Sequence, residues 1–125
     1  MNQKKFYLFI AHGSRESSAQ EGFEALLSNL APALKPNEVG GAYLTLNEPS
    51  IAAAIEAASE KGFKDFIIAP LFFFEGAHLK NDIPKILADL KLKNSDLDFH
   101  VMPAIASIET FSEWLVTKAI TPKRN

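Results

Sequence analysis

The sequence predicts an α/β protein in which a four-stranded parallel sheet lies between layers of helices. Four short apolar runs alternate with segments whose apolar residues recur every three or four positions. The connections between them are short, and the runs at residues 5–11 and 66–71 are apolar almost throughout, which is typical of strands covered on both faces. Strands and helices that alternate in this way form parallel sheets with right-handed crossovers.

The first two strand–helix units carry recognisable start and stop signals. Ser17 or Ser18 is expected to cap the first helix, and its apolar stripe stops before Pro36. A second strand is expected over residues 39–46. Pro49 then stands where proline is tolerated, at the entrance of the second helix.

The last two units are shorter. The strand at 66–71 leads to a third helix for which Asn81 or Asp82 is a candidate cap. A fourth strand is expected over residues 99–102, and Ser107 starts the last helix. The helical spacing predicts that this helix buries Ile108, Phe111 and Leu115.

Length, charge and composition exclude several classes of protein. A chain of 125 residues fits one domain, spanning residues 1–125. A net charge of −2 without a basic cluster gives no case for nucleic acid. The absence of cysteine excludes disulfides, cysteine-type zinc sites and iron–sulfur clusters. The apolar stretch that follows the basic N-terminal residues is too short for a signal peptide or a membrane span, so a cytoplasmic protein is expected.

Three polar side chains follow the ends of the first three predicted strands. His12 follows the first strand, Glu48 the second and His78 the third. In the common doubly wound order the first and third strands are neighbours, so these groups are expected to converge at the crevice where such folds bind ligands. Imidazole and carboxylate suit divalent first-row metals, and three ligands leave coordination positions open for chemistry. His100, inside the fourth strand, is expected to be structural.

Three segments resemble the short-form CbiX-type (CbiX/SirB-like) chelatases. They are Ala-His-Gly-Ser-Arg at 11–15, Leu-Asn-Glu-Pro-Ser at 46–50, and Pro-Leu-Phe-Phe-Phe-Glu-Gly-Ala-His at 70–78, which continues to Asp-Ile-Pro at 82–84. The resemblance spans the whole chain and implies a chelatase-like three-layer α/β/α domain. It implies a sirohydrochlorin cobaltochelatase or ferrochelatase of cobalamin or sirohaem biosynthesis that works as a homodimer. Co²⁺, Fe²⁺ or Ni²⁺ would be a substrate, with Co²⁺ foremost, and no cofactor would be tightly bound.

By this resemblance His12, His78 and Glu48 hold the metal, and one imidazole takes up a proton that the macrocycle releases. Sirohydrochlorin carries several carboxylates, for which the candidate partners are Ser14, Arg15 and Lys80. Ala11 and Ala77 stand where glycine is common in the family, a departure that concerns the pocket's shape. The phenylalanines at 72–74 are expected to be mostly core, with at most one lining the pocket.

Other readings of the same residues fit less well. A phosphoglycerate-mutase-like phosphatase would place arginine directly before the histidine, where this chain has Ala11. The Gly-x-Ser-x-Gly elbow of serine hydrolases is absent, and Gly13 stands alone where a dinucleotide-binding loop needs three glycines. The strongest rival is a carrier that binds metal or tetrapyrrole at the same residues without catalysing insertion.

Overall fold

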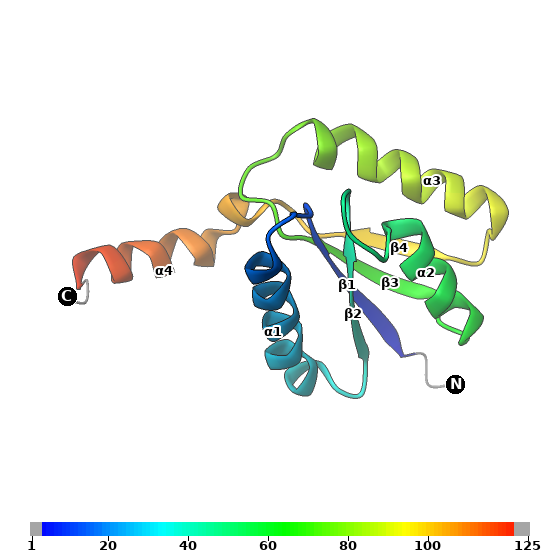
Figure 1. Cartoon of the computed structure of the whole chain (residues 1–125), viewed down its shortest axis with the longest axis horizontal. Helices are drawn as coiled ribbons and strands as arrows, with labels where there is room; N and C mark the ends of the chain where they lie inside the picture. The colour runs from blue at the N-terminus through cyan, green and yellow to red at the C-terminus, as the bar shows by residue number, and fades with distance from the viewer. Residues whose placement is uncertain (1–3, 122–125) are drawn as a thin grey trace.

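The computed structural model describes residues 4–121, which form a parallel four-stranded sheet with helices on both of its faces (Figure 1). The strands lie in the order β2-β1-β3-β4. This confirms the predicted α/β class and places the first and third strands side by side. The strands are β1 (Lys5–Ala11), β2 (Glu38–Tyr43), β3 (Asp65–Pro70) and β4 (Asp98–Val101).

Four α-helices connect and follow these strands. Two short turns of other helical types precede α3 and α4: η1 (His78–Asp82), which has π-helical hydrogen bonding, and η2 (Ile105–Ser107), a 3₁₀ turn. Across residues 4–121 no helix combines the length and the apolar character that a membrane span requires. The helices are α1 (Ser17–Leu34), α2 (Ile51–Glu60), α3 (Ile83–Lys93) and α4 (Glu109–Ile120).

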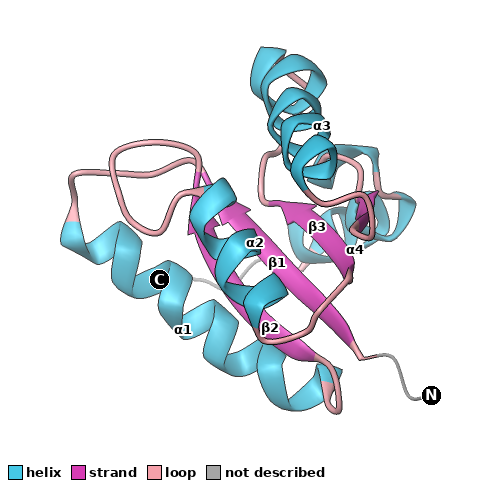
Figure 2. Cartoon of the chain, turned by 90° about the vertical axis from the view of Figure 1, so that its right-hand side faces the viewer, coloured by secondary structure: helices cyan, strands magenta, loops and turns pink. Residues whose placement is uncertain are grey.

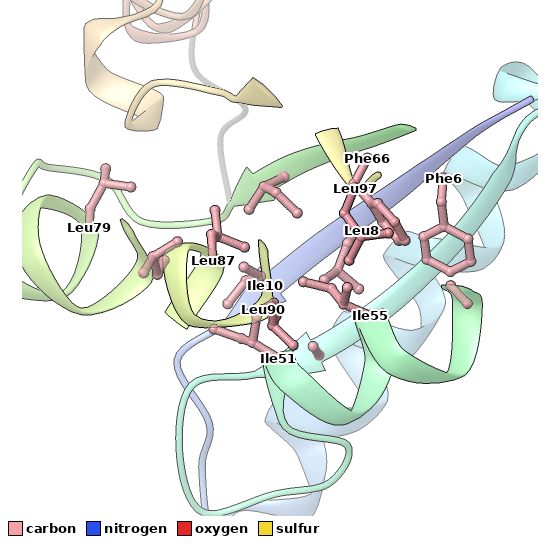
Figure 3. Packing of buried hydrophobic residues seen from close by; sticks show 14 of the residues in the cluster. Phe6, Leu8, Ile10, Ile51, Ile55, Phe66, Leu79, Leu87, Leu90 and Leu97 are labelled. Carbon is pink, nitrogen blue, oxygen red and sulfur yellow. The ribbon is translucent and has the colours of Figure 1, made fainter. Parts of the chain in front are cut away.

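The core lies between the sheet and the helices α2 and α3 (Figures 2 and 3). Alternate residues of each strand point to this face, as the pleat requires. Their apolar side chains meet the inward stripes of the two helices, and seven large side chains are almost completely removed from solvent. These are Leu8, Ile10, Ile51, Ile55, Phe66, Ile68 and Ile83.

The opposite face of the sheet is only partly covered. Helix α1 packs over β2, where the rings of Phe23 and Tyr43 meet edge to face at 5.3 Å. Gly41 permits this close approach, because a Cβ there would lie 2.6 Å from the Leu27 side chain. Beyond α1, the side chains of Tyr7 and Ile67 stay only half-buried.

Helix α4 extends away from the sheet (Figure 1) and contains no buried residue. The prediction that the last helix buries Ile108, Phe111 and Leu115 is therefore wrong within a single chain. Leu115 is 50% exposed, and the other two are only partly covered. The spacing correctly predicts a helix, but among residues 4–121 no strand packs against its apolar side chains.

The helix caps also differ from those predicted. Glu16 precedes α1 without a side-chain cap, and the hydroxyl of Ser14 instead accepts a hydrogen bond from the Glu16 N–H at 3.0 Å. The predicted cap at Ser17 or Ser18 is therefore wrong, because both residues already lie in the helix. Ser50 caps α2 by accepting from the Ala53 N–H at 3.1 Å, a cap that sequence reasoning missed.

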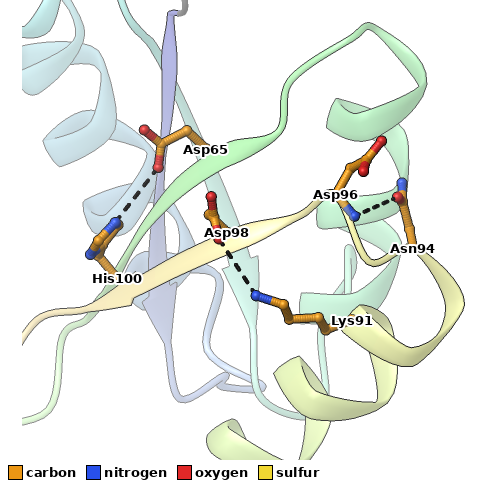
Figure 4. Close-up of polar contacts among 6 residues, drawn as sticks. All are labelled: Asp65, Lys91, Asn94, Asp96, Asp98 and His100. Carbon is orange, nitrogen blue, oxygen red and sulfur yellow. Dashed lines mark hydrogen bonds and ion pairs between the residues drawn. The ribbon is translucent and has the colours of Figure 1, made fainter.

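The third histidine lies on the edge strand β4 (Figure 4). The ring of His100 is 69% exposed, and its Nε2 lies 3.9 Å from an oxygen of Asp65, the first residue of β3. Further along the same edge, Lys91 and Asp98 form an exposed ion pair at 3.5 Å. His12, by contrast, follows the carboxyl end of β1. This position makes His100 a suitable control for the other two histidines.

Two leucines of α3 give a matched test of the core. Leu87 is 6% exposed and belongs to the core, whereas Leu92 is 86% exposed. We expect Leu87→Ala to lower the free energy of unfolding by about 2–5 kcal/mol, because it removes buried apolar area and leaves a cavity. Leu92→Ala is expected to stay within about 0.5 kcal/mol of the parent. Urea denaturation of both variants measures the difference, and equal losses would place the core elsewhere.

Candidate metal-binding site

The end of β1 is held by backbone hydrogen bonds on both sides. The Leu71 N–H donates to the Ile10 carbonyl at 2.8 Å, which continues the pairing with β3 beyond the last strand residue. On the other side the Thr45 N–H donates to the His12 carbonyl at 3.1 Å. The backbone of His12 is therefore anchored to its neighbour, although its side chain is exposed.

A tight turn follows His12 and fits closely against the loop after β2. Gly13 has a φ of +110°, and a Cβ at this position would lie 1.9 Å from the Thr45 carbonyl oxygen. Only glycine meets both conditions without strain. Next to it, the Ser14 N–H donates to the side-chain oxygen of Asn47 at 2.7 Å. Sequence reasoning missed this role of Asn47, for which the available signals were its place in a predicted loop and in the segment 46–50.

The second histidine starts η1. Its backbone carbonyl accepts a hydrogen bond from the Ile83 N–H, and the Lys80 N–H donates to the Gly76 carbonyl at 2.9 Å. Leu79 is 8% exposed and Ile83 is fully buried, so two apolar side chains anchor this turn to the core. The imidazole of His78 is half-exposed, and its Nδ1 lies 2.6 Å from Oδ2 of Asp82.

The structure brings the two predicted histidines together. The ring centroids of His12 and His78 are 5.1 Å apart, and the rings meet edge to face at 78°. Two imidazoles that bind one metal ion through nitrogen at about 2.1 Å, in a tetrahedral arrangement, have ring centroids about 5 Å apart. The pair thus has the spacing of two ligands to one ion. Phe72, whose ring lies 6.0 Å from that of His12, forms an apolar wall beside it.

Glu48 does not join this pair. Its side chain is exposed and lines a different hollow, which it shares with Gln20 and Glu24 of α1. The Tyr43 N–H donates to the Pro49 carbonyl at 2.9 Å, so the loop bends back toward β2 and α1 just after Glu48. Within residues 4–121 no three histidine or acidic side chains are placed to hold a metal together. The expected convergence of Glu48 with both histidines is therefore not found in this chain.

The candidate partners of substrate carboxylates flank the two histidines. Ser14 and Arg15 lie between His12 and the start of α1, and Lys80 lies in η1. Arg15 and Lys80 are exposed, and neither makes an ion pair within the described part of the chain.

The three phenylalanines after β3 are less buried than predicted. Phe72 packs partly against the core, but Phe73 is 58% and Phe74 is 77% exposed, so the expectation that most of them are core is wrong. Phe73 and Phe74 line a hollow of about 670 Å³ together with Phe111, Trp114 and Leu115. Backbone hydrogen bonds also tie this loop to the segment before α4. The Ile105 N–H donates to the Phe72 carbonyl at 2.9 Å, and the Ala106 N–H donates to the Phe73 carbonyl at 2.8 Å.

Tyr43 lies beneath the His12 loop and lines a small hollow of about 180 Å³ with His12 and Ser14. Burial raises the pKa of its phenol above the usual 10.0, and the Glu24 carboxylate raises it further. Both causes disfavour the phenolate, so Tyr43 is neutral at physiological pH. It therefore offers no negative charge to a metal held by the histidines.

The chain is therefore a parallel α/β domain in which His12, just after β1, meets His78, in the turn η1 that follows β3. The sequence model of the CbiX family matches residues 7–121, so this chain belongs to the CbiX family. It is 32% identical over 82 residues to the sirohydrochlorin ferrochelatase of Bacillus subtilis, an alignment that covers 66% of this chain and 31% of the relative. It is also 32% identical over 84 residues to the sirohydrochlorin cobaltochelatase of Sulfurisphaera tokodaii, covering 67% and 68% of the two chains.

A solved structure supports the fold independently. The sirohydrochlorin chelatase SirB of Bacillus subtilis subspecies spizizenii, crystallised in complex with cobalt, superposes with a TM-score of 0.83 at 24% identity. The superposition covers 96% of this chain and 51% of SirB. The chain spans between about a third and just over half of the length of several curated relatives that it matches.

Gly13 and Gly76 provide a matched test of the turn after β1. We expect Gly13→Ala to lower the free energy of unfolding by about 1–3 kcal/mol, because it adds a Cβ at positive φ against the Thr45 carbonyl. Gly76 lies before the other histidine, and a Cβ added there would meet no atom within 4 Å. Gly76→Ala should therefore change stability by less than about 0.5 kcal/mol. Chemical denaturation measures both variants. A Gly13→Ala protein as stable as its parent would show that the backbone of this turn accommodates a Cβ without strain.

Proposed function

We propose that this chain inserts a divalent metal, with Co²⁺ foremost and Fe²⁺ or Ni²⁺ as alternatives, into sirohydrochlorin or a closely related tetrapyrrole. The observation that carries the proposal is the pair of exposed imidazoles, His12 just after β1 and His78 in η1, with ring centroids 5.1 Å apart. Membership of the CbiX family and relatives named sirohydrochlorin cobaltochelatase and ferrochelatase support the same reaction.

Insertion exchanges one divalent ion for two pyrrole protons. The metal–nitrogen bonds of the macrocycle form as two N–H bonds break, and both protons must leave the site. His12 and His78 hold the ion as it loses water, and an imidazole that has released the ion can accept one of the protons. Two neutral ligands hold a divalent ion less firmly than a closed set of four, which favours its transfer to the macrocycle.

The flanking cations supply the binding surface for an acidic substrate. Arg15 and Lys80 lie on the two loops that carry the histidines, so we propose that they bind carboxylates at the rim of the macrocycle. Ser14 precedes Arg15 on the first of these loops, and its hydroxyl accepts a hydrogen bond from the Glu16 N–H. Phe72, beside His12, offers an apolar contact to the face of the ring system.

The metal is a substrate of the proposed reaction and not a resident cofactor. An ion that is to be transferred needs open coordination positions and moderate affinity, and the site exposes both imidazoles to solvent. Glu48 lies in the hollow beside α1. We propose that it assists metal insertion from there as an acidic side chain and does not bind the metal together with the two histidines.

The three histidines of the chain give a controlled test of the reaction. We expect His12→Ala and His78→Ala each to reduce Co²⁺ insertion into sirohydrochlorin by about 10²-fold or more, because each removes a metal ligand and a proton acceptor. His100→Ala, on the edge strand, is expected to keep the parent rate. An anaerobic absorbance assay measures insertion, and repeating it with Fe²⁺ and Ni²⁺ ranks the metals.

The same assay separates an enzyme from a carrier. Spectral changes that report binding of metal and macrocycle without insertion above the spontaneous rate would make this protein a carrier and overturn the proposed activity. Glu48→Gln is expected to lose less activity than either histidine variant, because its carboxylate lies outside the pair. A loss of activity as large as that of His78→Ala would indicate that Glu48 is a metal ligand after all.

We also propose that the protein acts as a homodimer in which α4 of each copy packs against the other copy. Trp114, Leu115, Val116 and Ile120 of this helix are 50–73% exposed, which is unusual for so many large apolar side chains on one short element. The sheet face beyond α1 is left half-covered.

Leu115 and Leu92 give a matched test of this assembly. Leu115→Glu is expected to convert a dimer into monomers, because it places a charge in the apolar hollow beside Phe73. Leu92→Glu makes the same change at an exposed position of α3 and should leave the dimer intact. Sedimentation velocity at several protein concentrations measures the mass of each species. A parent protein that stays monomeric at high concentration would contradict the assembly but not the metal chemistry.

A further inference from the structure

The shortest polar contact around the candidate site joins His78 to a residue of its own turn. Nδ1 of His78 lies 2.6 Å from Oδ2 of Asp82, four residues later. Both side chains are about half-exposed, so the contact is not forced by burial. It is set by the backbone of η1, which the buried side chains of Leu79 and Ile83 hold against the core.

Asp82 lies at the junction of η1 and α3, and its own backbone is helical, with a φ of −72° and a ψ of −48°. It directly precedes α3, yet its side chain makes no hydrogen bond to the first N–H groups of that helix. The carboxylate is directed to the imidazole instead. The prediction that Asn81 or Asp82 caps the third helix is therefore wrong, because both residues lie inside η1, which continues directly into α3.

A carboxylate beside a ring nitrogen determines where a neutral imidazole carries its hydrogen. A carboxylate can only accept, so Nδ1 carries the hydrogen and Nε2 keeps its lone pair. We propose that Asp82 is a positioning residue that fixes this tautomer of His78 and orients its Nε2 toward the incoming metal ion. The inference rests on the proposed function, because it assigns His78 as a metal ligand.

The two histidines are consequently not equivalent. Among residues 4–121, Asp82 holds the ring of His78, whereas neither ring nitrogen of His12 has a hydrogen-bond partner. His78 is the pre-oriented ligand, and His12 is free to turn its ring as the ion arrives or leaves. Removing the Asp82 carboxylate therefore affects the ring of His78 and leaves that of His12 unchanged.

The tautomer can be observed without any metal or substrate. Long-range ¹H–¹⁵N correlation spectra of the ¹⁵N-histidine-labelled protein, recorded at about pH 9 where an ordinary imidazole is neutral, distinguish hydrogen on Nδ1 from hydrogen on Nε2. His78→Ala and His12→Ala assign the signals. We expect His78 to carry its hydrogen on Nδ1 in the parent, and Asp82→Ala to populate the Nε2–H form at His78 alone.

Metal binding gives the second readout. Calorimetric titration with Co²⁺ alone is expected to show about 10- to 100-fold weaker binding for Asp82→Ala. Asp82→Asn keeps an oxygen that accepts from Nδ1–H, so it should retain the tautomer and bind Co²⁺ more tightly than Asp82→Ala does. Asp89 is an exposed aspartate of α3, the helix that follows η1, so Asp89→Ala serves as the control and should match the parent in both measurements.

Either of two results would overturn the inference: a parent His78 that carries its hydrogen on Nε2, or an Asp82→Ala protein with unchanged tautomer and unchanged Co²⁺ affinity. Both side chains are half-exposed, so the variants should fold, and thermal unfolding checks this. Failure of the proposed function gives a different pattern. A protein that binds Co²⁺ but inserts no metal would still show the Asp82 effects on tautomer and affinity.

Discussion

Parallel pairing of β1 with strands on both sides determines where the loop that carries the first histidine lies. Because β1 is central, the loop that leaves it has the ends of β2 and β3 as neighbours. Backbone hydrogen bonds hold Ile10, inside the strand, and His12, just past it, so the first histidine is fixed at the carboxyl end of the strand and not on a loose loop. The chain must then turn away at once, and Gly13 allows it to do so against the Thr45 carbonyl.

Much of this arrangement could be predicted from the sequence, because it depends on local patterns that the structure preserves. The apolar strands, the helical spacing and the polar residues after each strand were enough to predict the sheet, its central pair and the meeting of His12 with His78. The position of Glu48 could not be predicted in the same way. It depends on how one loop bends toward β2 and α1, and the order of the strands does not determine that path.

The sequence could not predict what surrounds α4 either, and the physical reason is different. Apolar residues at helical spacing indicate that a helix buries one side, but not whether the covering surface belongs to the same chain. Leu115 satisfies the pattern and is nevertheless half-exposed in this chain. In a similar way, Asp82 satisfies the pattern of a helix cap while its carboxylate contacts an imidazole. When a side chain can interact favourably with several partners, the sequence alone does not show which partner it contacts.

Backbone hydrogen bonds link the phenylalanine loop to the segment before α4, and in the proposed dimer this link couples the assembly to the site. The carbonyls of Phe72 and Phe73 accept hydrogen bonds from Ile105 and Ala106, and the same loop runs on to His78. In the proposed dimer, covering α4 therefore also stabilises the backbone that carries one of the two imidazoles. By mass action, local opening of this loop then becomes rarer as the protein concentration rises. Amide hydrogen exchange at this end of the sheet would depend on concentration, whereas exchange in the core beneath α2 would not.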